Sequence, residues 1–266
     1  MKSRISINRK QLIESLDAVR LKGKYKSAHT AKLSSISNGV TGVINDDGLS
    51  ITLGNASDTL AATCSIPIRV LNPLNSTSPK MFIFEVDMAL KYLKTFKEDM
   101  IHLGITTSKV TFSSGGRQAS VPLLVEHNGL PAITKVMSMV IPLDGSPPTF
   151  GKTTFETIIH LEGTVLAQAI KDCNTVGNAT YKIDFRSANF PEPPKLTLSS
   201  VNFQQTEEYI TEIEFISASG EDATLEFSAP LDKFTDGQMT LYLKDDCPIL
   251  LCGVNRKLIV APYIRG

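Results

Sequence analysis

The chain has 266 residues, 42% of them hydrophobic, and its 27 basic residues balance 27 acidic ones. This composition is typical of a globular protein with a buried core, and no apolar run approaches the 18 or more residues of a membrane span. The opening MKSRISINRK lacks the apolar stretch of a signal peptide, so we expect an intracellular protein.

The basic and acidic residues are unevenly distributed along the chain. Residues 1–133 hold 16 Lys and Arg against 10 Asp and Glu, whereas residues 134–266 hold 11 against 17. Charge sorted in this way lets one surface attract a polyanion while the protein stays neutral overall. The 4 Cys and 4 His are scattered without metal-ligand spacing, so we expect neither a metal site nor a cofactor.

The first predicted elements are a strand, a short turn and a helix in residues 4–19. One face of this helix holds Leu12, Ile13, Leu16 and Val19. The segment 20–32 that follows carries five bases and no acid. Two strands then flank a turn at residues 46–48, Asp-Asp-Gly. The first half of the chain is therefore predicted to be β-rich, with bases beside its first helix.

Residues 89–97, ALKYLKTFK, form the next predicted helix. Two sets of residues recur there at a spacing of three, Leu90, Leu93 and Phe96 and, one position later, Lys91, Lys94 and Lys97. On a helix each set has a face of its own, so one side is apolar and the other basic. A lysine stripe alone is most often a solvated face, but here the segment 20–32 is basic too.

A hairpin turning at Gly115-Gly116 follows, and then residues 131–154, rich in Pro and Gly, which read as a linker. Strand and helix return at residues 157–173, repeating the design of residues 4–19. A hairpin turning near Gly220, a very short helix at residues 229–234 and closing strands complete the pattern. Two similar units are predicted, each mostly antiparallel sheet with two short helices.

The motifs of common enzymes are absent. No GxSxG, HExxH, P-loop or GxGxxG occurs, and the acid pairs at 46–47 and 245–246 fall in predicted turns, where they more often cap or solubilise than catalyse. We therefore expect a protein that is not an enzyme. Lys and Arg that contact phosphates give affinity for nucleic acid without choice of sequence, and the basic first half fits that chemistry.

Several segments resemble the DNA sliding clamps. ISINRKQLIESLDAV is similar to the first strand and helix of a clamp domain, and residues 83–105 with 109–131 resemble the second half of the first domain of a bacterial β clamp. The C-terminal MTLYLKDDCPILLCGVNRKLIVAPYI resembles the closing hairpin of the family. Two-unit chains with these repeats also resemble the proliferating cell nuclear antigen of eukaryotes and archaea.

The resemblance implies an α+β fold of two clamp domains, residues 1–130 and 155–266, joined by an interdomain linker at 131–154. Antiparallel sheets would lie outside and two short helices per domain inside, in a six-domain ring. A two-domain chain would close such a ring as a head-to-tail homotrimer. The implied place of action is the cytoplasm of a prokaryote or of a virus-infected cell, or a nucleus.

The implied function is that of a DNA polymerase processivity factor that encircles double-stranded DNA without choice of sequence. The implied partners are a DNA polymerase, other proteins with clamp-binding peptides, an ATP-dependent clamp loader and further copies of the chain, with no membrane and no cofactor. The candidate bases facing DNA are Lys10, Arg20, Lys22, Lys24, Lys91, Lys94, Lys97 and Lys171. For Lys10 and Lys171 a plain surface base is an equal alternative.

Family clamps also hold partner peptides in an apolar pocket under the linker and beside the C-terminal strand. The positions that match this pocket are Leu130, Pro131, Pro248, Val260, Ala261 and Pro262. The alternative is that these are ordinary core and turn residues, and for Val260 the sequence favours that alternative.

Two other functions stay open at this point. A monomeric processivity subunit, or a heteromeric, checkpoint-type clamp subunit, shares the fold but not the homotrimer, because ring closure depends on pairing between edge strands of different subunits. A β-rich enzyme is the less favoured alternative, since no catalytic motif supports it.

Overall fold

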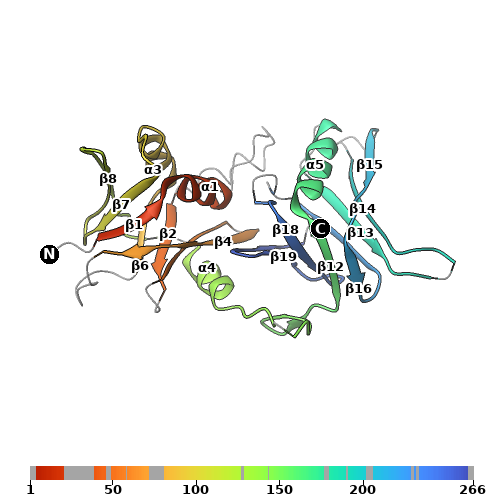
Figure 1. Cartoon of the computed structure of the whole chain (residues 1–266). Helices are drawn as coiled ribbons and strands as arrows, with labels where there is room; N and C mark the ends of the chain where they lie inside the picture. Colours follow the sequence, from red (N-terminus) through yellow and green to blue (C-terminus); the bar gives the residue numbers. More distant parts are fainter. Residues whose placement is uncertain are drawn as a thin grey trace. The chain divides into compact units, whose positions relative to one another are not determined.

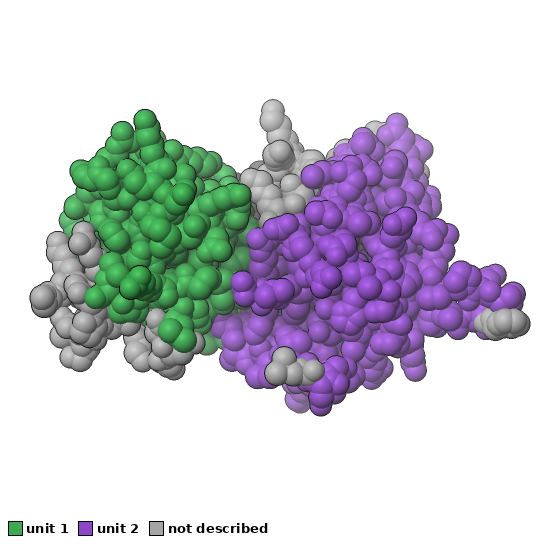
Figure 2. Space-filling view, viewed as in Figure 1, with its two compact units in different colours: residues 1–21, 32–57, 62–134 green, residues 22–31, 58–61, 135–266 purple. Residues whose placement is uncertain are grey.

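The computed structural model describes residues 4–20, 39–45, 49–57, 59–71, 81–126, 129–142, 144–176, 180–189, 191–201, 206–228, 231 and 234–262. The chain divides into two compact units (Figure 2). Unit 1 comprises residues 1–21, 32–57 and 62–134, and unit 2 comprises residues 22–31, 58–61 and 135–266. The division falls inside the predicted linker. Both units combine antiparallel strands with short helices, so the chain is α+β as predicted.

Unit 1 holds strands in two sheets (Figure 1). In one sheet the order is β5-β1-β7-β8-β9, and all of these neighbours pair antiparallel. In the other the strands of this unit follow the order β4-β3-β2-β6. The bounds are β1 Arg4–Asn8, β2 Gly39–Ile44, β3 Ser50–Ala56, β4 Leu60–Pro67, β5 Arg69–Val70, β6 Met81–Glu85, β7 Met100–Ile105, β8 Lys109–Ser114 and β9 Arg117–Pro122. The predicted turn at Gly115-Gly116 joins β8 to β9, and both glycines have positive φ.

Helix α1, Arg9–Val19, begins directly after β1. Asn8 is both the last residue of the strand and the N-cap, because its side-chain oxygen accepts a hydrogen bond from the Gln11 backbone N–H at 3.0 Å. The separate turn predicted between this strand and helix is therefore absent. Three residues of the predicted apolar face, Leu12, Leu16 and Val19, are buried, whereas Ile13 is half-buried.

Helix α3, Val86–Leu93, is shorter than the predicted helix 89–97 at its C-terminal end. The Thr95 hydroxyl donates to the Tyr92 carbonyl at 2.7 Å, and the Thr95 backbone N–H bonds the same carbonyl at 2.9 Å, so the chain leaves the α-helix in a tight turn. Phe96 lies beyond the helix but is still buried. Helices α1 and α3 pack against each other within unit 1 (Figure 1).

Unit 2 repeats the same design. One run of strands has the order β16-β12-β18-β19-β20 and a four-stranded sheet has the order β15-β14-β13-β17. Helix α5, Gly163–Cys173, starts directly after β12 and packs against β12, β14 and β15. A 3₁₀ turn, η1 Asn174–Val176, ends it. The strand bounds are β12 Thr157–Glu162, β13 Tyr181–Arg186, β14 Lys195–Val201, β15 Glu208–Glu212, β16 Ser217–Ser219, β17 Ala223–Phe227, β18 Gln238–Leu243, β19 Ile249–Gly253 and β20 Arg256–Val260.

The hairpin predicted to turn near Gly220 is wrong. Strand β16 pairs with β12, whereas β17 pairs with β13, so the two strands on either side of Gly220 belong to different sheets. Gly220 has φ 106°, and a Cβ there would lie 2.4 Å from the Glu156 carbonyl oxygen. The glycine thus marks a crossing between sheets. The short helix predicted at 229–234 lies largely outside the described residues.

The predicted linker contains regular structure. Helix α4, Leu130–Met137, opens it, and the small hairpin of β10, Thr149–Phe150, and β11, Thr153–Thr154, closes it. Ile133 of α4 is fully buried against β3, at a point where Gly54 leaves room for it. In the part of the chain that the structure describes, no helix combines the length and apolar character that crossing a membrane requires.

We expect Gly54→Ala to destabilise the protein by about 1–3 kcal/mol, because the added Cβ would meet Ile133 Cγ2 at 2.4 Å. Urea unfolding of the wild type, Gly54→Ala, Ile133→Ala and the double variant measures this. The double variant should be more stable than the sum of the two single effects predicts, since removal of the Ile133 side chain opens the space. Strict additivity would contradict the contact.

Candidate nucleic-acid interface and partner pocket

The three lysines that recur around α3 are all exposed. Lys91 lies in the last turn of α3, Lys94 is its C-cap, and Lys97 lies in the turn beyond. The three lysines therefore do not form the single helical stripe that the sequence predicted. None of the three has an ion-pair partner among the described residues. Opposite them, Leu90, Leu93 and Phe96 are at most 3% exposed, which fixes the lysines on the solvent side.

Arg20 is placed differently from these lysines. Its Nε lies 2.7 Å from Asp87 Oδ1 in α3, and its NH1 lies 3.8 Å from Asp17 Oδ1 in α1. The guanidinium therefore connects the two helices, and its charge is largely compensated by two carboxylates. Among the candidate bases, Arg20 is the one best placed to hold the helices together.

The other candidate bases lie apart from the α3 lysines. Lys10 is exposed on α1, with Glu14 at 3.9 Å. Lys171 is exposed on α5 in unit 2, and its neighbour Asp172 accepts a hydrogen bond from Gln168 at 2.7 Å. No ion pair of Lys171 occurs in the described structure. Lys22 and Lys24 lie outside the described residues.

A pocket of about 860 Å³ opens within unit 2, between the linker and the sheet. Its volume is in the range of sites that take a small molecule or a few peptide side chains. The linker residues 137–141 form one wall, and the sheet forms the rest. The sheet residues that line it are His160, Leu161, Ile216, Ser217, Gln238, Met239, Thr240, Tyr242, Cys252, Gly253, Val254 and Lys257.

The linker wall is held in place by both packing and a polar contact. The Met139 side chain is buried, at 6% exposure, and the Lys257 ammonium donates a hydrogen bond to the Met139 carbonyl. Burial lowers the pKa of Lys257. Burial also raises the pKa of the neighbouring Cys252 thiol to about 12 and raises that of Tyr242. Neither Cys252 nor Tyr242 is therefore primed as a nucleophile.

The residues predicted for a partner pocket do not line this one. Leu130 and Pro131 begin α4, and Pro248 precedes β19. Val260 ends β20 and is fully buried, which agrees with its reading as a core residue, and Ala261 and Pro262 follow it. The signal that was missed is the apolar run inside the linker, Val136–Ile141, which a linker crossing the open surface would not need.

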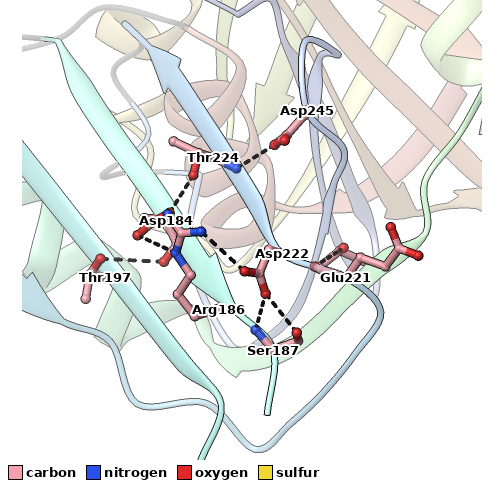
Figure 3. A network of polar contacts seen from close by, with 9 residues as sticks. Asp184, Arg186, Ser187, Thr197, Glu221, Asp222, Thr224 and Asp245 are labelled. Carbon is pink, nitrogen blue, oxygen red and sulfur yellow. Dashed lines mark hydrogen bonds and ion pairs between the residues drawn. The ribbon is translucent and has the colours of Figure 1, made fainter. Parts of the chain in front are cut away.

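A network of polar contacts is also found in unit 2 (Figure 3). Arg186 NH2 lies 3.0 Å from Asp184 Oδ1 and NH1 lies 3.2 Å from Asp222 Oδ2. Asp222 Oδ1 accepts from both the backbone N–H and the hydroxyl of Ser187 at 2.8 Å. The Asp245 carboxylate accepts from the Thr224 N–H at 2.6 Å. Each acid is engaged with neighbours of its own unit, so the network stabilises the sheet and the loops beside it.

A search of the described residues finds no group of three or more His, Cys, Asp or Glu side chains that could hold a metal ion. Two features of the described residues remain: exposed ammonium groups in unit 1 and, in unit 2, a pocket of mixed polar and apolar lining that contains one lysine.

Comparison with known proteins identifies the fold. No family model matches the sequence, and no curated protein matches it. Solved structures do: the DNA polymerase sliding clamp of Caulobacter crescentus aligns with a TM-score of 0.65 at 17% identity over 99% of this chain and 66% of that one. The DNA polymerase III β subunit of Pseudomonas aeruginosa aligns with a TM-score of 0.69 at 13% identity, over 98% and 66%.

The A. fulgidus PCNA, solved with the C-terminal region of FEN-1 bound, aligns with a TM-score of 0.66 at 14% identity over 99% of both chains. The chain thus spans 66% of the two bacterial proteins but the whole of the archaeal one. These likenesses confirm the predicted sliding-clamp fold.

Asp222→Asn should destabilise the protein only at pH values at which the Asp222 carboxylate of the wild type is charged. The Ser187 hydrogen bonds and Arg186 lower the pKa of Asp222 from its ordinary 3.8, so its contribution to stability is present above that pH and is lost as the pH falls through the lower folded value. We expect the stability difference between wild type and variant to be largest near neutral pH and to shrink as the pH falls below 3.8, the ordinary pKa of the carboxyl.

Urea unfolding across pH measures this difference. Asp246→Asn is the matched control, since Asp246 is an exposed turn residue with no hydrogen bond or ion pair in the described structure. A difference for Asp222→Asn that persists unchanged in acid would contradict the assignment.

Proposed function

Because the chain has the fold of the DNA sliding clamps, we propose that it is a DNA polymerase processivity factor that encircles double-stranded DNA. The observation that carries the proposal is the trio Lys91, Lys94 and Lys97, which is exposed at and just beyond the C-terminal end of α3 and has no ion-pair partner among the described residues. Ammonium groups free to meet phosphates bind DNA of any sequence, which is what a protein that slides along DNA requires.

We place the DNA contacts on the helices of both units. Lys91, Lys94 and Lys97 are the main contacts, and Lys171 of α5 and Lys10 of α1 add to them. Contacts bridged partly by water are weak enough to permit sliding. Arg20, already held by Asp17 and Asp87, supports the helices rather than the DNA. Lys22 and Lys24 are included in the proposal only because of their place in the basic segment 20–32 of the sequence.

The proposed assembly is a homotrimer closed head to tail, with residues 1–130 and 155–266 as the two clamp domains and 131–154 as their linker. Two end strands support it: β9 and β15 each end a described sheet, so their outer edges have no partner among the described strands. Arg117 begins β9 and Glu208 begins β15, while Glu212, which ends β15, is paired with Lys195 at 2.9 Å. A base at the start of β9 and an acid at the start of β15 favour pairing of β9 with the β15 of another copy.

The pocket of unit 2 is the proposed docking site for partner peptides. An apolar groove that takes side chains from an extended or turn-forming peptide is a common mode of recognition. The archaeal relative in the comparison was solved with the C-terminal region of FEN-1, and by analogy we propose short segments of a DNA polymerase and other DNA-processing proteins as the ligands here. An ATP-dependent loader would open the ring. The protein would act inside the cell, without catalysing a reaction.

The alternative function is that of a monomeric or heteromeric clamp-fold subunit. It would use the same lysines and pocket but would need a different protein, or none, at the β9 and β15 edges. The mass in solution and the retention on DNA distinguish it from the homotrimer.

Light scattering across a concentration series should give a species of three times 29.0 kDa. This trimer should be retained on nicked circular DNA and lost when the circle is cut, because only a closed ring is trapped topologically. Arg117→Glu should shift the mass toward the monomer, whereas Lys109→Glu, on the neighbouring interior strand, should not. A monomer at every concentration would contradict the homotrimer and favour the alternative.

Lys91, Lys94 and Lys97 changed together to Glu should abolish retention on circular DNA while the fold and the mass stay unchanged. Reversal of three charges replaces attraction to phosphates by repulsion. The matched control reverses three exposed lysines on strands and in a turn, Lys109, Lys152 and Lys182. Circular dichroism checks the fold. Full retention in the helix variant would contradict the placement of DNA on α3.

A further inference from the structure

The unit 2 pocket contains one lysine and no acid. Its lining includes Lys257 but no Asp or Glu, and the His160 ring also lines it, with Nδ1 3.0 Å from Thr240 Oγ1. Around it stand apolar side chains that are open to solvent: Val140 is 76% exposed, Ile216 61% and Val254 92%. Exposed apolar side chains gathered around a groove are typical of a surface that a partner covers.

The Lys257 ammonium is only partly satisfied where it lies. It is partly buried and donates to the Met139 carbonyl, and no carboxylate pairs with it in the described structure. An ammonium has three N–H donors, so two remain available. Removal of this charge from water is costly unless an anion compensates it. A ligand that covers the pocket would complete that burial, and an anion on the ligand would offset its cost.

The ligand's anion is limited to a single charge. A nucleic acid or other polyanion is bound by several cations spread over a surface, whereas the lining of this pocket has a single Lys and no Arg, among neutral polar and apolar side chains. A carboxylate matches it as a charge-assisted hydrogen-bond acceptor, and a peptide side chain brings that group together with apolar neighbours.

We propose that the pocket binds a short peptide in which apolar side chains fill the groove and one Asp or Glu carboxylate binds Lys257 Nζ. Lys257 then has two roles: it holds the linker wall through Met139 and selects acidic peptides. This inference rests on the proposed function of the pocket and adds to it the chemistry of the partner.

Selection from a phage-displayed library of random nonapeptides tests the proposal, with the full chain and its Lys257→Gln, Lys257→Arg and Lys152→Gln variants panned in parallel. Gln keeps an N–H donor but carries no charge, and Arg keeps the charge. Lys152 is an exposed linker lysine outside the pocket lining and serves as the control. Thermal unfolding verifies that each variant is folded.

The wild type, Lys257→Arg and Lys152→Gln should each select peptides that combine apolar residues with an Asp or Glu at a constant distance from them in the peptide sequence. Lys257→Gln should select apolar peptides without that acid. Fluorescence anisotropy with the most enriched peptide and its Asp→Asn or Glu→Gln counterpart should show about a tenfold weaker Kd for the neutral peptide. That difference should vanish on Lys257→Gln.

Three results would overturn the proposal: no selected peptide, peptides without an enriched acid, or the same acid preference on Lys257→Gln. Measuring the DNA retention and the mass of the same variants distinguishes failure of this inference from failure of the proposed function. A trimer that is retained on circular DNA but shows no acid preference defeats only the inference, whereas loss of retention and trimer in the wild type defeats the function itself.

Discussion

Burial of one face of each short helix against a sheet is the constraint on which the rest of the structure depends. In α3, Leu90 and Leu93 are buried, and Phe96 is buried just beyond it. Helices of 8 and 11 residues have little stability of their own, so this packing is what holds them in place. Because one face is committed to the sheet, every lysine of the opposite face must project into solvent.

The same packing decides which bases are available to a ligand. Arg20 lies where α1 and α3 meet, and there Asp17 and Asp87 take up its charge. Lys91, Lys94 and Lys97 lie away from that contact, and no acid reaches them in the described structure. Bases that look alike in the sequence thus have different roles. Arg20 connects two helices, whereas the three lysines form an exposed surface that can contact DNA.

In unit 2 the position of the linker determines where a ligand could bind. Met139 is buried, and the Lys257 ammonium binds its carbonyl, so residues 137–141 are held over the sheet and form one wall of a pocket. A linker without this attachment would leave only an open sheet surface. The charged network around Arg186 lies elsewhere in the unit, and its charges pair with one another, whereas Lys257 in the pocket has no carboxylate partner among the described residues.

The sequence by itself determined the α+β class, the two repeated units, the apolar faces of the helices and the exposed lysines around α3, because these depend on local periodicity and on the order of residues. Only the tertiary structure decided what depends on contacts between distant residues. It assigned β16 and β17 to different sheets, paired Arg20 with Asp87, and put Lys257 beside Met139, 118 residues earlier in the chain. Periodicity reports which side of an element is buried, but only packing determines what lies against it.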